Sequence, residues 1–356
     1  MIDEIWEKCT RKLILIGQGI NDEELSTELT RLILSDSVVI LKEATSNLNV
    51  PGAYSSIDRM FSYVKDFEEF KPDLLITIGG AIVSKKIKVL LQNNQPQYHW
   101  DIRLDDSKDT FKALTHHFNV STLEVVKVLS KSSNLESFQN VWRLQNTNTL
   151  KAHDNYLDQV EYSDLFVFSK ILAQLRRESI LHLANSTPVR YAQLFEPKVS
   201  LTYLSNRGVS GIDGSTSTAL GYASLSPKPN ILITGDMSFF YDSNAFWIDS
   251  LPTHFKIIVI NNGGGGIFRY IPGPDTTNQL ESVFESHHNL TAKTICEQFG
   301  LDYHRIDSKE ELNQQLPSFI INESSQISLL EIMTPRLGNA KILRDYFSYI
   351  ETELYT

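Results

Sequence analysis

The chain has 356 residues, of which 41% are hydrophobic and 21% charged, and its formal net charge is −10. These values are ordinary for a globular protein, and the length corresponds to about two domains of ~150 residues each. An acidic chain without a basic stretch is not expected to bind nucleic acid. Its two cysteines form no CxxC pair and no apolar stretch reaches the ~20 residues of a membrane helix, which argues against a disulfide framework, a thiolate zinc site and a membrane span.

The N-terminal third alternates strand-like and helix-like segments. Its first ten residues, MIDEIWEKCT, are acidic where a secretory signal is positive, so we predict a cytoplasmic protein. Apolar runs such as KLILI, SVVIL and DLLITI then alternate with amphipathic segments such as EELSTELTRLIL and KKIKVLL. Strands that alternate with helices in this way form βαβ units around a parallel sheet. We predict an α/β, Rossmann-like central domain over residues 1–150.

The rest of the chain predicts a second domain that carries the binding site. Residues 151–178 are helical in pattern and are predicted to form a linking helix, and the strand–helix alternation returns over residues 179–356. Ten of the 17 glycines lie from Gly208 to Gly273. Glycine is favoured where a backbone approaches a ligand, and loops at the carboxyl ends of parallel strands form the ligand crevice. We therefore predict two doubly wound, mainly parallel domains, with the site in the second.

Two apolar strands of the second domain end in polar residues. Gly235-Asp236 follows NILIT, and Asn261-Asn262 follows FKIIVI and precedes four glycines at 263–266. Carboxylate, amide and carbonyl oxygens are the ligands that Mg²⁺ prefers, and a site of this kind leaves positions open for a diphosphate. A lone Gly-Asp pair is more often a helix cap, so the metal interpretation depends on the whole pattern.

This pattern resembles the thiamine-diphosphate motif, which begins with GDG and ends in NN, although Met237 stands where the motif has its second glycine. Residues 205–214, SNRGVSGIDG, resemble the signature of one family of thiamine-diphosphate enzymes, the 2-succinyl-5-enolpyruvyl-6-hydroxy-3-cyclohexene-1-carboxylate synthases of menaquinone biosynthesis. Stretches 185–190, 235–244 and 261–268 resemble the same family in the same order. The resemblance covers nearly the whole chain, as the family's middle and C-terminal domains.

The resemblance implies roles for individual residues in a cofactor site. Asp236, Asn262 and the carbonyl of Gly264 would ligate Mg²⁺ or Mn²⁺, and Ser238 with nearby backbone amides would hold the diphosphate. Ile212 would brace thiamine in its bent form. The implied cofactor-binding set is Gly211, Ile212, Gly235, Asp236, Met237, Ser238, Asn262, Gly264 and Gly265.

The resemblance also implies the substrates. The family decarboxylates 2-oxoglutarate and adds the resulting succinyl-semialdehyde carbanion to isochorismate in a Stetter-type conjugate addition. Arg190 and Arg207 would act in catalysis beside Ile212, because a guanidinium group pairs with a carboxylate through two parallel hydrogen bonds. Lys86 replaces an arginine of the family. The implied substrate-binding set is Ser186, Arg190, Arg207, Lys85, Lys86, Ile267, Phe268 and Ile271.

The family's reaction needs a glutamate that protonates the aminopyrimidine ring of the cofactor. In this class of enzymes the glutamate belongs to an N-terminal pyrimidine-binding domain, and the site forms between that domain of one subunit and the diphosphate domain of another. We find no second region able to supply this domain. We therefore expect a shortened synthase that is poorly active or inactive alone, and a homodimer or homotetramer in the full-length form.

Three alternatives remain open. The chain is compatible with another thiamine-diphosphate enzyme, such as a 2-oxo acid decarboxylase or an acetolactate synthase, and with a non-catalytic cofactor-binding module. The pair Gly17 and Gly19 suggests a nicotinamide-binding module, but Asp22 stands where GxGxxG has its third glycine. His287-His288 has no third ligand at metal spacing, so we expect this pair to face solvent.

Overall fold

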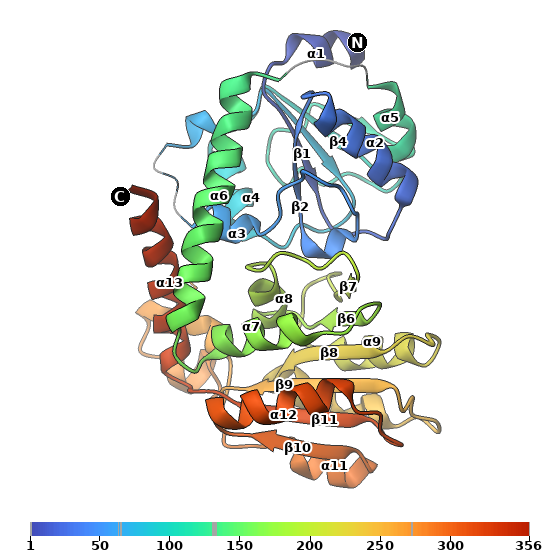
Figure 1. Ribbon diagram of the computed structural model, residues 1–356, viewed down its shortest axis with the longest axis vertical. Coiled ribbons are helices and arrows are strands. Elements are labelled where there is room, and N and C mark those ends of the chain that lie inside the picture. The colour runs from blue at the N-terminus through green and yellow to red at the C-terminus, as the bar shows by residue number, and fades with distance from the viewer. Residues whose placement is uncertain (1, 63, 65, 130–133, 272, 356) are drawn as a thin grey trace. The chain divides into compact units, whose positions relative to one another are not determined.

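The computed structural model describes residues 2–62, 64, 66–129, 134–271 and 273–355, and the chain divides into two units (Figure 1). Unit 1 comprises Met1–Asp154, Gln193–Val199 and Phe347–Thr356, and unit 2 comprises Asn155–Ala192 and Ser200–Tyr346. Each unit contains one sheet, in which every strand pairing is parallel. The predicted α/β class with two parallel sheets is therefore confirmed.

Unit 1 has a five-stranded sheet of order β2-β1-β3-β4-β5. The strands are β1 (Lys12–Ile16), β2 (Val39–Lys42), β3 (Leu74–Ile78), β4 (Tyr98–Ile102) and β5 (His116–Phe118). The helices are α1 (Ile2–Lys8), α2 (Glu23–Leu34), α3 (Ile57–Met60), α4 (Lys85–Asn93), α5 (Thr122–Val128) and most of α6 (Glu136–Gln159). Alternate residues of β1 belong to two core clusters, Ile14 to one and Leu15 to the other. This sheet is thus covered on both faces, as a parallel sheet requires.

The loops after β1 and β3 meet where the strand order of unit 1 reverses, the place where such sheets bind ligands. The N–H of Gly17 donates to the Ile78 carbonyl, that of Gln18 to the Ala81 carbonyl, and that of Gly80 to the Gln18 carbonyl. A Cβ on Gly17 would overlap the carbonyl oxygen of Gly80. The N–H groups that a dinucleotide phosphate needs are bonded within the chain, which argues against the nicotinamide-binding alternative.

Glu43 is a fully buried carboxylate directly after β2. Its oxygens accept hydrogen bonds from the N–H of Val83 at 2.7 and 2.8 Å and from the N–H of Ser84 at 2.8 Å. Ser84 is also the N-cap of α4, so Glu43 attaches the start of this helix to the sheet. Burial raises the pKa of Glu43 to about 7.

We expect the titration of Glu43 to destabilise unit 1 as the pH rises toward and through 7. A carboxyl whose pKa is raised from 4.5 to about 7 binds more protons in the folded state, so its contribution is complete below pH 4.5 and disappears as the pH passes 7. At ~1.4 kcal/mol per pKa unit, this loss is about 3 kcal/mol. Burial lowers the pKa of His99 to about 4 and that of His153 to about 3, so these two histidines of unit 1 add stability as the pH rises and oppose the effect of Glu43.

The contribution of Glu43 is therefore measured as a difference between two proteins. Urea unfolding at pH 5 and pH 8, followed by tryptophan fluorescence, should show stability changing more favourably with rising pH in Glu43→Gln, which does not titrate, than in the wild type. Equal pH slopes for both proteins would contradict the assignment.

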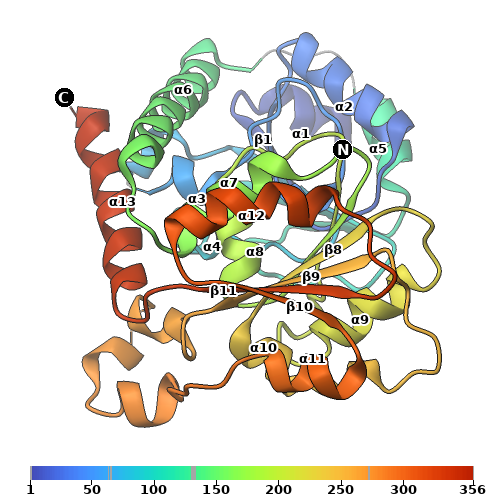
Figure 2. The ribbon, with the colours of Figure 1, turned by 60° about the horizontal axis from the view of Figure 1, so that its bottom comes forward.

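Unit 2 has a six-stranded sheet of order β10-β11-β9-β8-β6-β7. The strands are β6 (Ile180–Leu183), β7 (Thr202–Leu204), β8 (Asn230–Gly235), β9 (Phe255–Asn261), β10 (Asp302–Ile306) and β11 (Ser328–Met333). The helices are α7 (Asp164–Gln174), α8 (Thr187–Ala192), α9 (Ser215–Ala223), α10 (Asp236–Tyr241), α11 (Lys293–Phe299), α12 (Lys309–Ile321) and the first half of α13 (Gly338–Tyr355). Figure 2 shows α12 on one side of β10 and β11, and α11 on the other.

The segment that connects the two sheets along the sequence differs from the prediction. Residues 151–178 were expected to form one linking helix, but they contain the end of α6 and all of α7, separated at residues 160–163. The side chain of Ser163 accepts a hydrogen bond from the N–H of Phe166 and so begins a new helix. Among the described residues, no helix is both long and apolar enough to cross a membrane.

Candidate functional site

The candidate site lies in unit 2, at the carboxyl edge of its sheet. The strand order reverses at β6, since β7 lies on one side of it and β8 on the other. Asn185 and Ser186 follow β6, and Asp236 follows β8. Doubly wound sheets bind ligands at such a reversal. The topology therefore points to the same residues as the sequence pattern does, and independently of it.

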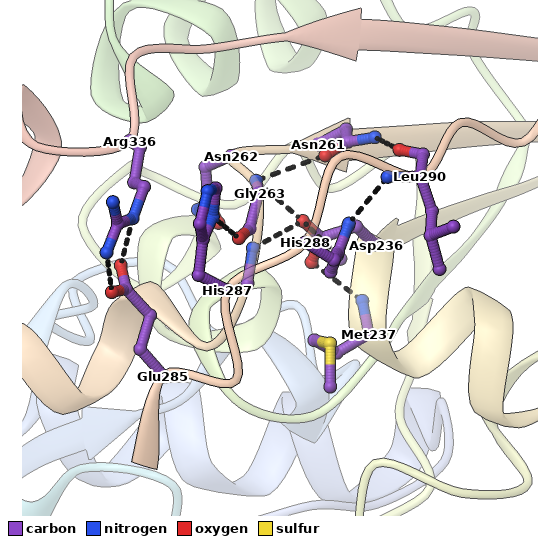
Figure 3. Close-up of polar contacts among 12 residues, drawn as sticks. Asp236, Met237, Asn261, Asn262, Gly263, Glu285, His287, His288, Leu290 and Arg336 are labelled. Carbon is purple, nitrogen blue, oxygen red and sulfur yellow. Dashed lines mark hydrogen bonds and ion pairs between the residues drawn. The ribbon is translucent and has the colours of Figure 1, made fainter. Parts of the chain in front are cut away.

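Asp236 is buried at the start of α10, with 3% of its surface exposed. Its Oδ1 accepts a hydrogen bond from the N–H of Met237 at 2.6 Å, and its Oδ2 accepts from the N–H groups of Gly263 and Gly264 at 2.9 Å each. Figure 3 shows Asp236 between Met237 and Gly263. One carboxylate thus joins the end of β8 to the glycine-rich loop after β9.

Asn262 presents one satisfied and one unsatisfied polar atom. Its Nδ2 donates to Oδ2 of Asp164 at 3.1 Å, whereas its Oδ1 is buried and has no hydrogen-bond partner among the described residues. Burial raises the pKa of Asp164 to about 6. An amide oxygen without a partner costs ~1–3 kcal/mol, which a bound cation would offset.

Gly264 completes the oxygen set that the resemblance implies. Its φ of +147° is a conformation that side chains disfavour, and a Cβ there would lie 2.6 Å from the carbonyl oxygen of Glu285. The Gly264 carbonyl accepts from the N–H of Gly266 at 2.9 Å and keeps a second lone pair. Together with Asp236 and the unsatisfied oxygen of Asn262, this carbonyl makes a donor set that fits Mg²⁺ or Mn²⁺.

A buried ion-pair cluster anchors the glycine-rich loop. The carbonyl of Glu285 accepts from the N–H of Gly265 at 2.6 Å, and its carboxylate accepts from Arg269 and Arg336, with shortest distances of 2.6 Å (Figure 3 draws the pair with Arg336). Burial alone would raise the pKa of Glu285, but these hydrogen bonds hold it down at about 2. None of these three charged residues was predicted from the sequence, because no local pattern connects them.

A hydrogen bond from Ser238 holds the loop that carries Ile212. Oγ of Ser238 donates to the Ile212 carbonyl at 2.6 Å, so this hydroxyl, assigned by resemblance to the diphosphate, is engaged with the protein backbone here. The Ile212 side chain is half-buried. A Cβ on Gly211 would overlap the carboxylate of Asp213. Gly235 ends β8 directly before Asp236.

The two predicted arginines contact neighbouring residues after β6, Arg207 the side chain of Asn185 and Arg190 the carbonyl of Ser186. The buried side chain of Asn185 donates from Nδ2 to the carbonyls of Asn206, at 2.5 Å, and Gly211, at 2.7 Å, and its Oδ1 accepts from Nη1 of Arg207 at 2.7 Å. Arg190, on α8, donates from Nη1 to the Ser186 carbonyl at 2.8 Å. Both guanidinium groups are half-buried and follow neighbouring strands.

The other predicted substrate residues are placed as follows. Ile267 and Phe268 lie in a short helix over Gly266–Arg269, with Ile271 just after it, and all three are half-buried. Lys85 and Lys86 belong to unit 1, where Lys85 is exposed. Lys86 lies with its Nζ 3.3 Å from the carbonyl of Asp58 and 3.4 Å from the ring centroid of Phe347, and burial lowers its pKa to about 8.

The expectation that the histidine pair faces solvent is wrong for His288. Its side chain is 12% exposed, and its Nε2 lies 3.3 Å from Oδ2 of Asp236. Its Nδ1 accepts from the N–H of Leu290 at 3.1 Å, so the neutral ring carries its proton on Nε2, facing the carboxylate. His287 is exposed, with Nδ1 2.9 Å from the Gly263 carbonyl. The metal-spacing criterion missed His288, because the ring contacts a carboxylate that lies far away in the sequence.

Comparison with known proteins identifies the cofactor. Residues 186–332 match the family described as "Thiamine pyrophosphate enzyme, C-terminal TPP binding domain". Residues 186–332 therefore carry a TPP-binding domain of this family. The matched region contains every predicted site residue of unit 2. The predicted thiamine diphosphate cofactor is thereby confirmed.

Over nearly its whole length, the chain is similar to curated proteins named 2-succinyl-5-enolpyruvyl-6-hydroxy-3-cyclohexene-1-carboxylate synthase. It is 42% identical over 353 residues to the protein of Flavobacterium johnsoniae, covering 97% of this chain and 63% of the relative. It is 39% identical over 356 residues to that of Christiangramia forsetii and 36% identical over 372 residues to that of Porphyromonas gingivalis, covering 62% and 64% of those relatives. The predicted resemblance is confirmed, and the chain spans less than two thirds of these relatives.

Proposed function

We propose that this chain is the part of a 2-succinyl-5-enolpyruvyl-6-hydroxy-3-cyclohexene-1-carboxylate synthase that holds thiamine diphosphate through a divalent cation and binds the substrates' carboxylates. The cofactor follows from the family match. The choice of reaction is supported by the similarity to proteins of that name over 97% of the chain or more. The observation that carries the cation site is the buried Oδ1 of Asn262, which has no hydrogen-bond partner among the described residues and lies next to the loop that Asp236 holds.

The chain's own residues would orient the cofactor. Asp236, Oδ1 of Asn262 and the Gly264 carbonyl would hold Mg²⁺ or Mn²⁺, and with it the diphosphate. Thiamine diphosphate, when bound, supplies the electron sink for decarboxylation and carbon–carbon bond formation. Ile212 would brace the thiamine, and the hydrogen bond from Ser238 to its carbonyl keeps this backbone in place.

Arg190 and Arg207 would bind carboxylates of 2-oxoglutarate and isochorismate. Arg190 donates from Nη1 to the Ser186 carbonyl, and Arg207 donates from Nη1 to Oδ1 of Asn185. A guanidinium group has five N–H donors and pairs with a carboxylate through two parallel hydrogen bonds. Both substrates are dianions and the chain has a net charge of −10, so binding needs cations placed locally. Ser186 would add a hydroxyl, Lys86 a further charge, and Ile267, Phe268 and Ile271 apolar contacts.

We also propose that a pyrimidine-binding domain with a catalytic glutamate completes the site, from a partner subunit of a homodimer or homotetramer. The synthase relatives are longer than the region they share with this chain. A cytoplasmic location is supported by the two cysteines, Cys9 and Cys296, which are buried and unbridged.

A direct test follows isochorismate loss by absorbance, with 2-oxoglutarate, thiamine diphosphate and Mg²⁺ present. The chain is assayed alone and together with the part of the Flavobacterium johnsoniae synthase outside the matched region. We expect consumption only by the complemented chain, and only with 2-oxoglutarate. Activity of the chain alone would refute the need for a further domain. Decarboxylation of pyruvate without isochorismate loss would favour the decarboxylase or acetolactate synthase alternative, and cofactor binding without turnover would favour a non-catalytic module.

A further inference from the structure

Asp164 is a buried carboxylate that none of the sequence motifs includes. It is the first residue of α7 and is 2% exposed. Its Oδ2 accepts from Nδ2 of Asn262 at 3.1 Å, and its Oδ1 accepts from Oγ1 of Thr334 at 2.6 Å. Its own N–H donates to Oδ1 of Asn339 at 2.8 Å. Three separate segments, at the start of α7, the end of β9 and the end of β11, therefore meet at this side chain.

The two ends of the Asn262 amide have nearly the same shape but opposite chemistry. The oxygen has lone pairs for a cation, whereas the NH₂ group has only donors, so a site that uses this amide works in one orientation only. Both oxygens of the Asp164 carboxylate accept hydrogen bonds, and an accepting oxygen pairs only with the NH₂ end of an amide. Asp164 therefore selects one orientation, and in this orientation Oδ1 of Asn262 has no hydrogen-bond partner among the described residues.

We propose that Asp164 is a positioning residue that fixes the Asn262 amide with its nitrogen toward α7 and its oxygen available to the cation. Asp164 itself does not touch the cation; it acts through Asn262. The identity of the cation rests on the proposed function, whereas the orientation of the amide does not. The two parts of the inference are therefore tested separately.

The orientation is tested without any cofactor. In the chain labelled with ¹⁵N at asparagine, the Asn262 side-chain NH₂ signal is assigned through Asn262→Ser. We expect it to be protected from solvent exchange by ~10-fold or more in the wild-type chain and to lose this protection in Asp164→Ala. Thr334→Val is the matched control, because it removes the other hydrogen bond to the same carboxylate and leaves Asn262 intact. An NH₂ signal of the same protection in Asp164→Ala and wild type would overturn the inference.

The consequence for the cation is tested by titrating Mn²⁺ in the presence of thiamine diphosphate and reading free Mn²⁺ by electron paramagnetic resonance. Asp164→Ala should weaken Mn²⁺ binding by ~10-fold or more. Asp164→Asn should retain affinity within ~3-fold, because its amide oxygen accepts from Asn262 while its NH₂ donates to the Thr334 hydroxyl. A merely structural role would lower the melting temperature without this rescue, so equal weakening in both variants would contradict positioning.

An exchange of the two side chains gives the sharpest outcome. Asn262→Asp alone places two carboxylates at hydrogen-bond distance, where they repel each other, and should weaken Mn²⁺ binding. The double variant Asp164→Asn/Asn262→Asp restores the hydrogen bond with its polarity reversed and should bind ~10-fold more tightly than that single variant. Additive effects would overturn the inference. If the wild-type chain binds no Mn²⁺ with thiamine diphosphate, the proposed cation site fails, and the exchange measurement still decides the orientation.

Discussion

Asp236→Ala should abolish the metal-dependent binding of thiamine diphosphate by this chain. The substitution removes the only charged group of the proposed cation site and, with it, the acceptor for the N–H groups of Met237, Gly263 and Gly264. Hydrogen bonds to a charged group contribute ~1.5–3 kcal/mol each, so losing the charge and the loop anchor should weaken binding by ~100-fold or more. Calorimetric titration of thiamine diphosphate, with and without Mg²⁺, measures the effect.

Asp242→Ala is the matched control for this experiment. Asp242 is a second buried carboxylate, at the other end of the same helix α10, and it accepts from the N–H and Oγ of Ser217. Its removal should lower the melting temperature and leave the affinity within a few-fold of the wild type. An unchanged affinity in Asp236→Ala would rule out the proposed cation site. A similar loss in both variants would indicate that the helix, and not the carboxylate, matters.

The sequence was sufficient to predict the strands and the edge on which the site lies. Buried parallel strands appear as continuous apolar runs, and their carboxyl ends meet on one edge. The residues that end β8 and β9 therefore had to be neighbours once both strands were recognised. The hydrogen bonds from the N–H groups of Gly263 and Gly264 to Asp236 show that these residues are neighbours. The roles of individual residues came from the resemblance and remain predictions.

The residues that support the site could not be predicted in the same way. Asp164 lies 98 positions from Asn262, and its place in SDLFVF suggests only the start of a helix. His288 and Glu285 lie in a polar stretch without periodicity. Their partners are decided by how loops pack, which no local pattern encodes.

One supporting residue did leave a signal. Glu331 interrupts the apolar strand SLLEIM, and a charge in a buried strand must be paired. Its oxygens accept from Nδ2 of Asn261 at 2.8 Å, from the N–H of Ala292 at 2.9 Å and from the hydroxyl of Tyr303 at 2.7 Å. A lone carboxylate inside an apolar run would thus have indicated a partner for the first asparagine of the Asn-Asn pair.

Arg190→Ala and Arg207→Ala should each raise a substrate KM or lower turnover by ~10²-fold or more in the complemented enzyme. A charged hydrogen bond to a carboxylate contributes up to ~3 kcal/mol, and its loss appears in kcat/KM. Steady-state kinetics with 2-oxoglutarate and isochorismate varied in turn measure which substrate each arginine binds. Arg207 also donates to Asn185, which in turn donates to the carbonyls of Asn206 and Gly211. Because Gly211 is in the predicted cofactor-binding set, the affinity for thiamine diphosphate is measured in the same variants.

The division between KM and cofactor affinity separates a substrate contact from a loop anchor. If Arg207 binds a substrate carboxylate, its removal changes the KM of that substrate and leaves thiamine diphosphate affinity nearly unchanged. If it serves only to hold Asn185, cofactor affinity falls as well. Arg305→Ala is the matched control, because Arg305 is exposed on β10 and pairs with Asp307, two positions away. Kinetics of the Arg190 and Arg207 variants that equal those of Arg305→Ala would place the carboxylate-binding pocket elsewhere.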